Sequence, residues 1–292
     1  MVANPVPRRI ALVVHPTRAV QRALATVTRW AGEHGVDVVQ LAVHDDHHRE
    51  LAAPGTLEDG DLVVAVGGDG TVLAALRVAA VSNAPVLGVA CGSLGALSAV
   101  PAEKLAEGLE RMWAGAWTAR SLPALAVGAA GEPDDWAAND FVVVRRGAGQ
   151  VVADVAVDDE LYVRVAGDGL VVATALGSSA YSMAAGGPVM AAGTAAFVCT
   201  PLAMHGGTAA PLVVPADAVV TVEVHPGYAG FDVEIDGRDR VFAGHRFRLT
   251  LHPDKLTLVT FGPSGRGLAG LRKRRLISDS PRVLARDARA GR

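Results

Sequence analysis

The sequence has few aromatic residues, only two cysteines and no strong excess of charge of either sign. Phe, Trp and Tyr make up 4% of the 292 residues, so the core must be built mainly from small side chains such as Ala and Val. A net charge of −3 argues against nucleic acid as the main partner. Cys91 and Cys199 lie in apolar runs, which favours buried thiols over a structural disulfide.

Long hydrophobic runs are also missing. No stretch approaches the roughly 20 apolar residues that span a bilayer, and no apolar segment of the length of a secretion signal follows Met1. These absences predict a cytoplasmic protein that has neither a membrane nor nucleic acid as a partner. Half of the residues are hydrophobic, and the length suffices for one large domain or two of average size.

The first part of the chain alternates between short apolar runs and helical patterns. Strands are expected at residues 9–14, 36–43, 61–66 and 85–90, and helices at 17–35 and 71–80. Short apolar strands separated by helices predict a parallel sheet covered on both faces, with ligands at the carboxyl ends of its strands. We therefore expect an α/β domain over residues 1–116.

From about residue 117 strand-like runs follow each other with turn signals between them, which predicts a mainly antiparallel, β-sandwich-like domain over residues 117–262. One helix is expected to begin near Ser178. The segment 263–292 is rich in Arg, Gly and Ser, and we expect it to be partly disordered. The expected strands are 121–127, 140–145, 151–157, 160–165, 170–174, 196–200, 219–225, 231–235, 247–252 and 255–261.

The most informative segment is Gly67-Gly68-Asp69-Gly70-Thr71, between an apolar strand and a helix. Adjacent glycines let backbone N–H groups approach a phosphate, a positive φ is expected at Gly68, and the helix adds its N-terminal dipole. Asp69 would repel phosphate unless it takes a proton or holds Mg²⁺. The alternative is a tight turn in which Asp69 only caps the helix. Thr71 and a second Gly-Asp-Gly at 167–169 favour a site of phosphoryl transfer.

Three other polar segments have simpler interpretations. The histidines and aspartates of residues 44–48 are capable of binding metal, but they lack further ligands at convincing spacing, so a solvated loop is expected. His205 follows a strand and is interpreted as a structural residue or a ligand contact. The basic run 271–275 is interpreted as a solvated helix face.

The motifs, in combination, resemble the NAD kinase family. The GGDGT turn at 67–71, residues 85–95, Asn139-Asp140, residues 167–181 and 185–188, and Asp236-Gly237 follow the order of that family's motifs. Diacylglycerol kinases and phosphofructokinases share the GGDGT turn, but the later motif of the former is not found. The resemblance implies an active site in the cleft between an α/β domain and a β-rich domain, and a homodimer or homotetramer assembled through the latter.

The resemblance also implies a reaction and roles for residues. The family transfers a phosphoryl group from ATP or polyphosphate, with a divalent metal such as Mg²⁺, to the 2′-hydroxyl of the adenosine ribose of NAD. Asp69 would take the proton of that hydroxyl, and Asp168 would reach the nicotinamide end; no metal site made of protein side chains is implied. The phosphate loop would comprise Gly67, Gly68, Gly70 and Thr71, and the remaining substrate-binding residues would be Asn139, Asp140, Thr174, Ser178, Ser179, Ala180 and Tyr181.

Several positions depart from the family pattern, and they leave alternatives open. Ala96 replaces a phenylalanine, Ala175-Leu176 replaces Pro-Thr, Ala90 replaces an asparagine, and Ala210 stands where arginine is frequent. A diverged kinase that acts on a nucleoside, sugar or polyol is therefore the second hypothesis. A silent nucleotide-binding module is the third, and the intact Asp69 argues against it.

Overall fold

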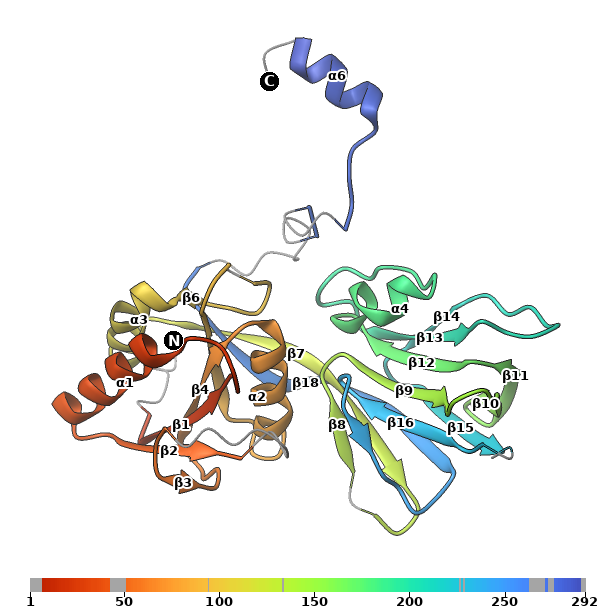
Figure 1. Ribbon diagram of the computed structural model, residues 1–292, viewed down its shortest axis with the longest axis horizontal. Helices are drawn as coiled ribbons and strands as arrows, with labels where there is room; N and C mark the ends of the chain where they lie inside the picture. The colour runs from red at the N-terminus through yellow and green to blue at the C-terminus, as the bar shows by residue number, and fades with distance from the viewer. Residues whose placement is uncertain are drawn as a thin grey trace.

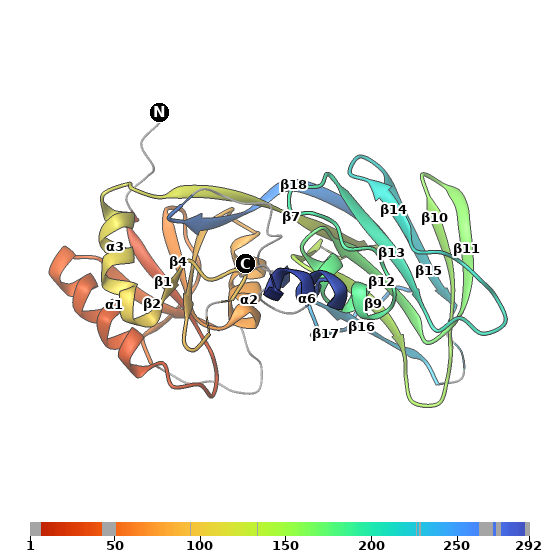
Figure 2. The same ribbon diagram turned by 90° about the horizontal axis from the view of Figure 1, so that it is seen from above.

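The computed structural model describes residues 7–42, 51–93, 95–132, 134–225, 227, 229–262, 271–272 and 276–289. It has an N-terminal α/β half and a C-terminal β half, with the two long strands β7 (Thr118–Ala129) and β18 (Arg246–Thr260) running from one to the other (Figures 1 and 2). Among the described residues, none of the helices has the length and apolar character needed to cross a membrane.

The N-terminal half is a parallel sheet. Its strands lie in the order β5-β4-β1-β2-β3, and β6 pairs with β5. The elements of this half are β1 (Arg9–Val14), α1 (Gln21–His34), β2 (Asp37–Leu41), β3 (Pro54–Gly55), β4 (Asp61–Gly67), α2 (Asp69–Ala79), β5 (Pro85–Ala90), β6 (Val100–Pro101), η1 (Ala102–Lys104) and α3 (Leu105–Trp113).

Helices cover both faces of this sheet. On one face Val27 and Trp30 of α1 and Leu109 of α3 pack against the strands, and on the other face Val72 and Leu76 of α2 do so. The central strand β4 is buried along its whole length, as expected for a strand covered on both faces. The predicted doubly covered parallel sheet is confirmed.

The C-terminal half is a sandwich of two antiparallel sheets. One sheet has the order β11-β10-β15-β18, with β7 also paired to β18, and the other has the order β14-β13-β12-β9-β16-β17. Their facing sides enclose a core that includes Phe141, Phe197 and Phe247. The remaining elements here are β8 (Asp135–Ala137), β9 (Asp140–Arg145), β10 (Val151–Val157), β11 (Glu160–Gly167), β12 (Gly169–Thr174), η2 (Gly177–Ser179), α4 (Tyr181–Ala184), β13 (Ala196–Leu202), β14 (Leu212–Pro215), β15 (Val219–His225), β16 (Phe231–Ile235) and β17 (Asp239–Arg240).

β18 joins the two halves into one continuous sheet of 12 strands. Its first part pairs with β15 of the sandwich, and its last part pairs with β5 of the parallel sheet. The prediction of two separate strands at 247–252 and 255–261 is therefore wrong. A register shift between His252 and Leu256 accommodates Pro253, which has no N–H for the ladder, and β7 remains paired on both sides of the shift.

Other elements differ from the predicted ones at their ends. Helix α1 begins at Gln21 rather than at residue 17, which leaves a loop after β1. The expected helix near Ser178 is divided into η2 and the short α4. α3 was not predicted, and neither was α6 (Pro281–Arg289), which stands away from both halves (Figure 1) and has no buried residue. Both cysteines are free thiols; Cys199 is fully buried and Cys91 is half-buried. The domain boundaries at residues 116 and 262 stay a prediction.

Candidate active site

Three turns lie side by side at the carboxyl edge of the parallel sheet. The N–H of His15, after β1, donates to the Val66 carbonyl of β4 over 3.0 Å, and the N–H of Cys91, after β5, donates to the Gly67 carbonyl over 2.8 Å. The GGDGT turn therefore lies between the two other strand ends. This is the edge at which open α/β sheets bind ligands.

The carboxylate of Asp69 is held in a fixed position. Asp69 begins α2; its Oδ2 accepts the N–H of Ala96 over 3.0 Å, and its Oδ1 accepts the N–H of Leu97 over 3.1 Å. A side chain at Gly95 would overlap this carboxylate, because its Cβ would lie 2.6 Å from Asp69 Cγ. Each carboxylate oxygen retains acceptor capacity for a ligand. Asp69 thus has the geometry of an oriented acceptor of a proton.

The glycines of the turn have different reasons to be glycine. A Cβ at Gly67 would lie 2.7 Å from Thr71 Cβ, so the buried Thr71 fills the space beneath the turn. Gly68 has φ −121° and extended backbone, so the positive φ expected there is wrong. Gly70 is exposed, and among the described residues no atom outside its chain neighbours and its own helix backbone lies within 4 Å of a Cβ placed on it. The turn is therefore packed on its inner side and open at Gly70.

The loop between β1 and α1 also reaches this turn. Nδ1 of His15 accepts the N–H of Thr17 over 3.2 Å and that of Arg18 over 3.1 Å. The pKa of His15 is lowered by burial and by the positive charge of Arg18. Because residues 17–20 were expected to be helical, this loop was missed. Its only signal in the sequence is its position after the first strand of a parallel sheet.

In the other half, Asp236 fixes the backbone that carries Asn139 and Asp140. Asp236 follows β16, and its carboxylate accepts the N–H groups of Ala138, Asn139 and Asp140 over 3.0, 2.7 and 3.2 Å. From the other side Gly177 packs so closely that a Cβ would lie 2.8 Å from Asn139 Cα. The Asn139-Asp140 segment is thus clamped from two directions.

Asp140 is almost completely buried among acidic groups. Its exposed fraction is 5%, and burial raises the pKa of its carboxyl to about 7, with smaller contributions from the negative charges of Asp236 and Glu234. Burial also raises the pKa of Asp236, against the three N–H groups that favour its charged form. Asp140 therefore changes charge near neutral pH, which fits a group that titrates in an active site.

Asp168 lies at the opposite end of the same strand pair. β12 pairs antiparallel with β9, so Asp140 faces Ala173, whereas Asp168 accepts Nε of Arg145 over 2.5 Å. The five steps along β9 from Asp140 to Arg145 span roughly 16 Å. Partial burial raises the pKa of Tyr181, with smaller contributions from the negative charges of Glu234, Asp168 and Asp140.

The other predicted substrate-binding residues divide into inner and outer positions. Thr174 is fully buried; its hydroxyl donates to the Ala138 carbonyl over 2.7 Å and accepts the N–H of Gly177. The hydroxyl of Ser178, also fully buried, donates to the Ala175 carbonyl over 2.8 Å and accepts the N–H of Met190. These two hydroxyls shape the turn after β12. Ser179 is half-buried, and Ala180 is exposed.

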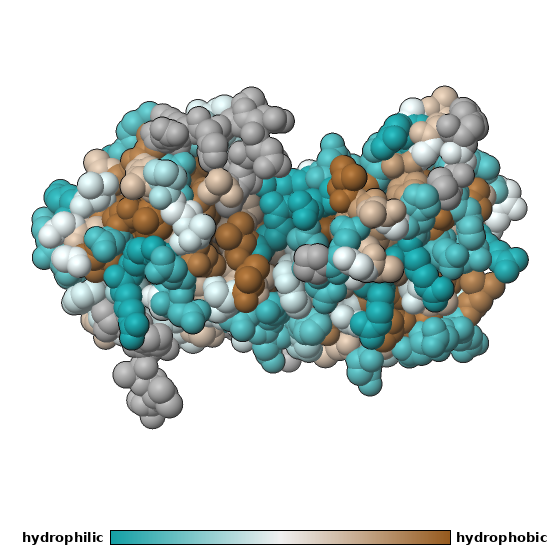
Figure 3. Space-filling view, turned by 90° about the horizontal axis from the view of Figure 1, so that it is seen from below, coloured by the Kyte–Doolittle hydropathy of each residue, from teal (hydrophilic) through white to brown (hydrophobic). Residues whose placement is uncertain are grey.

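One apolar cluster holds the two halves of the site together. Leu176 and Ala138 of the β half pack in the same cluster as Val72 and Leu97 of the α/β half, and the N–H of Leu97 is one of the two donors to Asp69. The turn after β12 and the segment that precedes Asn139 therefore share an apolar cluster with α2 and with the loop that holds Asp69. Where the halves meet, hydrophilic side chains gather near the middle of the surface seen from below (Figure 3).

The departures from the family pattern occupy unlike environments. Ala175 is 3% exposed, and Leu176 packs in the cluster between the halves, so its apolar character serves packing. Ala96 is exposed beside Asp69, and Ala90 is buried at the end of β5. Ala210 is exposed, and its carbonyl accepts the hydroxyl of Tyr162. Leu176 and Ala96 are the replacements beside the turns of the site. Leu176 is packed, whereas Ala96 is exposed.

The remaining candidates lie elsewhere or outside the described residues. Residues 44–48 and 273–275 are outside them. His205 is exposed, and its N–H donates to the Ala166 carbonyl over 2.7 Å. In the part of the chain that the structure describes, no group of three or more His, Cys, Asp or Glu side chains is arranged to hold a metal ion.

The fold and this arrangement define a two-part protein with a glycine-aspartate turn in its α/β half and a hydrogen-bonded pair of aspartates, Asp140 and Asp236, in its β half. Residues 10–117 match the family described as ATP-NAD kinase N-terminal domain, and residues 138–252 match the ATP-NAD kinase C-terminal domain. The chain belongs to the NAD kinase family.

Individual relatives agree with this assignment. The chain is 34% identical over 224 residues to an NAD kinase of Nitratidesulfovibrio vulgaris, covering 74% of this chain and 73% of the relative. It is 42% identical over 108 residues to NAD kinase 1 of Streptomyces avermitilis, a match that covers 35% of this chain but only 29% of the relative's length. The fold is similar to that of an NAD kinase from Archaeoglobus fulgidus in complex with ATP, with a TM-score of 0.71, 24% identity, and coverage of 92% of this chain and 100% of the other.

Proposed function

We propose that the protein is an NAD kinase, which transfers the γ-phosphoryl group of ATP to the 2′-hydroxyl of the adenosine ribose of NAD and thereby forms NADP. The observation that carries the proposal is the Asp69 carboxylate, which the N–H groups of Ala96 and Leu97 hold at the carboxyl edge of the parallel sheet. A general base within hydrogen-bond reach of the acceptor hydroxyl is what this reaction requires of a side chain.

In this proposal the α/β half binds the ATP phosphates and the β half binds NAD. The ATP phosphates lie at the open side of the turn formed by Gly67, Gly68 and Gly70, where the dipole of α2 and backbone N–H groups favour negative charge. The adenosine part of NAD lies at Asn139 and Asp140, and its nicotinamide end extends along β9 and β12 toward Asp168. Tyr181, Ala180 and Ser179 cover the dinucleotide between these ends, while Thr174 and Ser178 hold the turn from beneath.

The chemistry is mainly positioning and neutralisation of charge. Asp69 takes the proton of the 2′-hydroxyl as the oxygen attacks the γ-phosphorus, and ADP leaves with the bridging electrons. Asp69 is the carboxylate beside the proposed phosphate position, and it would be the neighbour of a Mg²⁺ ion carried by ATP, since Mg²⁺ usually takes one or two carboxylates plus substrate phosphates. When bound, the ion would help to neutralise the charge on the transferred group.

Three further parts of the proposal rest on the family resemblance and on composition. The protein works in the cytoplasm, where the unpaired Cys91 and Cys199 remain thiols. It assembles as a homodimer or homotetramer through the β half. Inorganic polyphosphate serves as an alternative phosphoryl donor if the site binds only the phosphate chain of ATP and not its nucleoside.

A second acceptor is the alternative favoured by one observation. Ala96 is exposed next to Asp69, where the family pattern has an aromatic ring. The missing ring widens the acceptor side and removes a stacking surface for a base, which favours a smaller hydroxyl acceptor such as a nucleoside, sugar or polyol.

Consumption of ATP by the purified protein with Mg²⁺ separates these functions. The panel of acceptors contains NAD, NADH, nucleosides and polyols, and the product from NAD is identified as the 2′-phosphate by mass spectrometry and ³¹P spectra. We expect the highest kcat/KM with NAD. ATP consumption with another acceptor but not with NAD would reject the proposal and support the alternative.

A further inference from the structure

Arg18 lies beside the glycine turn that the proposed function assigns to the donor. Its guanidinium is close to Gly68, where a Cβ would lie 3.1 Å from Nη1 and 3.5 Å from Cζ. The same Nη1 is 3.9 Å from the Cβ position of Gly92, the exposed glycine after β5. The guanidinium therefore stands between the glycine turns that follow two neighbouring strands.

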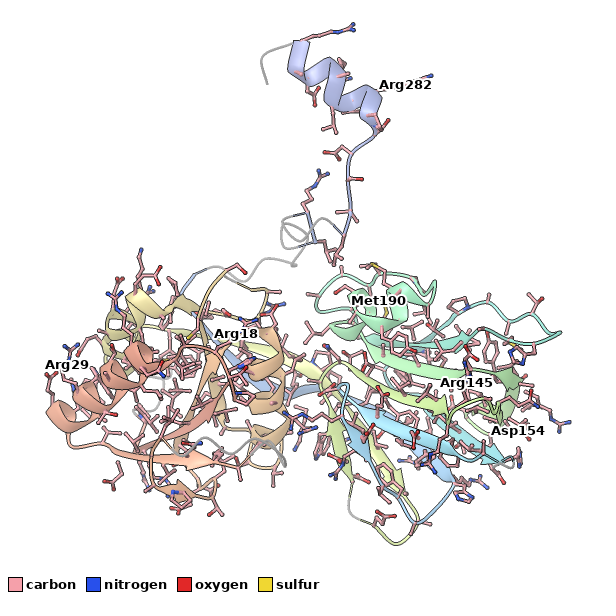
Figure 4. The ribbon with its side chains drawn as sticks, in the orientation of Figure 1. Arg18, Arg29, Arg145, Asp154, Met190 and Arg282 are labelled. Atoms are coloured by element: carbon pink, nitrogen blue, oxygen red, sulfur yellow. The ribbon has the colours of Figure 1, made fainter. Side chains whose placement is uncertain are left out.

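The pKa values of two titratable groups are consistent with this position of the Arg18 charge. Arg18 lowers the pKa of His15, which lies after β1, in the same direction as burial does. It also opposes the rise that burial causes in the pKa of Cys91, which lies after β5. Together with its approach to Gly68 after β4, this places the Arg18 guanidinium near the ends of all three strands. Figure 4 shows Arg18 inward, beside α2, whereas Arg29 of α1 lies at the outer edge of the molecule.

We propose that Arg18 binds the phosphate chain of the donor and adds a positive charge to the backbone N–H groups of the glycine turn. The inference rests on the proposed function for the identity of the donor as a nucleoside triphosphate or polyphosphate. A guanidinium offers up to five N–H donors in a planar fork, which suits phosphate oxygens. Gly68 itself has no side chain, and the guanidinium lies beside it, so a phosphate at the turn contacts both backbone N–H groups and Arg18.

The position of Arg18 depends on the loop geometry. Nδ1 of His15 accepts the N–H groups of Thr17 and Arg18, which closes a tight turn directly after β1. This turn directs the Arg18 side chain across the edge of the sheet instead of outward along α1. His15 is thus a positioning residue for Arg18, and its neutral form is the one that accepts these hydrogen bonds.

The test measures binding of inorganic tripolyphosphate and of NAD separately by calorimetric titration. Three variants are compared with the wild type: Arg18→Gln, Arg18→Lys, and the matched control Arg29→Gln on the exposed face of α1. For Arg18→Gln we expect tripolyphosphate affinity to fall by about 10- to 100-fold, as for loss of a charge-assisted hydrogen bond. NAD affinity should be unchanged. Arg18→Lys should lose less, because it retains the charge but not the fork, and Arg29→Gln should bind like the wild type.

Each result decides the inference separately from the proposed function. Unchanged tripolyphosphate affinity in Arg18→Gln, equal losses in Arg18→Gln and Arg29→Gln, or no binding by the wild type would overturn it. If the wild type binds tripolyphosphate through Arg18 but does not phosphorylate NAD, the inference stands and the proposed acceptor is wrong. If NAD is phosphorylated and the KM for ATP is the same in Arg18→Gln as in the wild type, the proposed function stands and the inference is wrong.

Discussion

The two halves of the site are built in different ways. On the α/β side the turn is formed by five consecutive residues, Gly67 to Thr71, and most of its contacts to a ligand would come from the backbone. On the β side the bonds that fix Asn139 and Asp140 come from Asp236, 96 to 98 positions away along the chain. A turn made of consecutive residues can be recognised from the sequence alone. Hydrogen bonds between distant segments form only when the chain folds, so the sequence does not reveal them.

The largest loss of activity is expected from a change at Asp69. Asp69→Asn keeps the shape of the side chain and can still accept one of the two N–H groups, but it cannot take the proton of the acceptor. We expect kcat to fall by about 10²- to 10⁴-fold, measured as NADP formation at saturating ATP and NAD.

The control for this variant is Asp37→Asn, an exposed aspartate at the start of β2. It should retain wild-type turnover, and circular dichroism should show both variants folded. A folded Asp69→Asn protein with nearly wild-type kcat would remove Asp69 from the mechanism and leave it the role of holding the loop at Ala96 and Leu97.

On the α/β side, alanine substitutions at two glycines of the turn test how closely each glycine is packed. Gly67→Ala forces a methyl group against Thr71, so we expect the free energy of unfolding to fall by about 1–3 kcal/mol. Gly70→Ala meets open space, so its stability should stay within about 1 kcal/mol of the wild type. Denaturant unfolding of both variants measures the difference. Equal stability of the two would show that the turn does not have the packing described for Gly67.

The free energy of unfolding is expected to depend on pH through Asp140 of the β half. The pKa of Asp140 in the folded protein, about 7, is above the ordinary value of 3.8, so the folded protein holds a proton that the unfolded chain releases between these values. The free energy of unfolding should therefore fall as pH rises from about 4 to 7, by at most about 4 kcal/mol from this group. Asp140→Asn should lack this part of the fall.

Unfolding curves of the wild type and Asp140→Asn at pH 5 and pH 8 test this expectation. The variant should gain stability relative to the wild type at pH 8 and little at pH 5, whereas Asp37→Asn should follow the wild type at both. A constant difference between Asp140→Asn and the wild type across this range would mean that Asp140 keeps its ordinary pKa.

The contrast between the halves also explains which features the sequence predicted. The strands of the parallel sheet and the GGDGT turn were readable, because each depends on residues within one short segment. β18 was misread as two strands, since only its pairing along β7 keeps it continuous through Pro253. Arg18 was missed because helical periodicity masked a loop, and the structural roles of Thr174 and Ser178 were missed because their hydrogen bonds depend on the folded turn after β12.

The assignment of ATP to one half and NAD to the other is tested most directly by calorimetric titration of each ligand into Gly70→Val. A Cβ at Gly70 would enter open space at the turn, so the valine side chain would occupy the position proposed for the phosphates. We predict that ATP affinity falls at least about tenfold while NAD affinity stays within about twofold of the wild type, a range that corresponds to less than 1 kcal/mol. Unchanged ATP affinity, or loss of NAD affinity alone, would contradict the assignment.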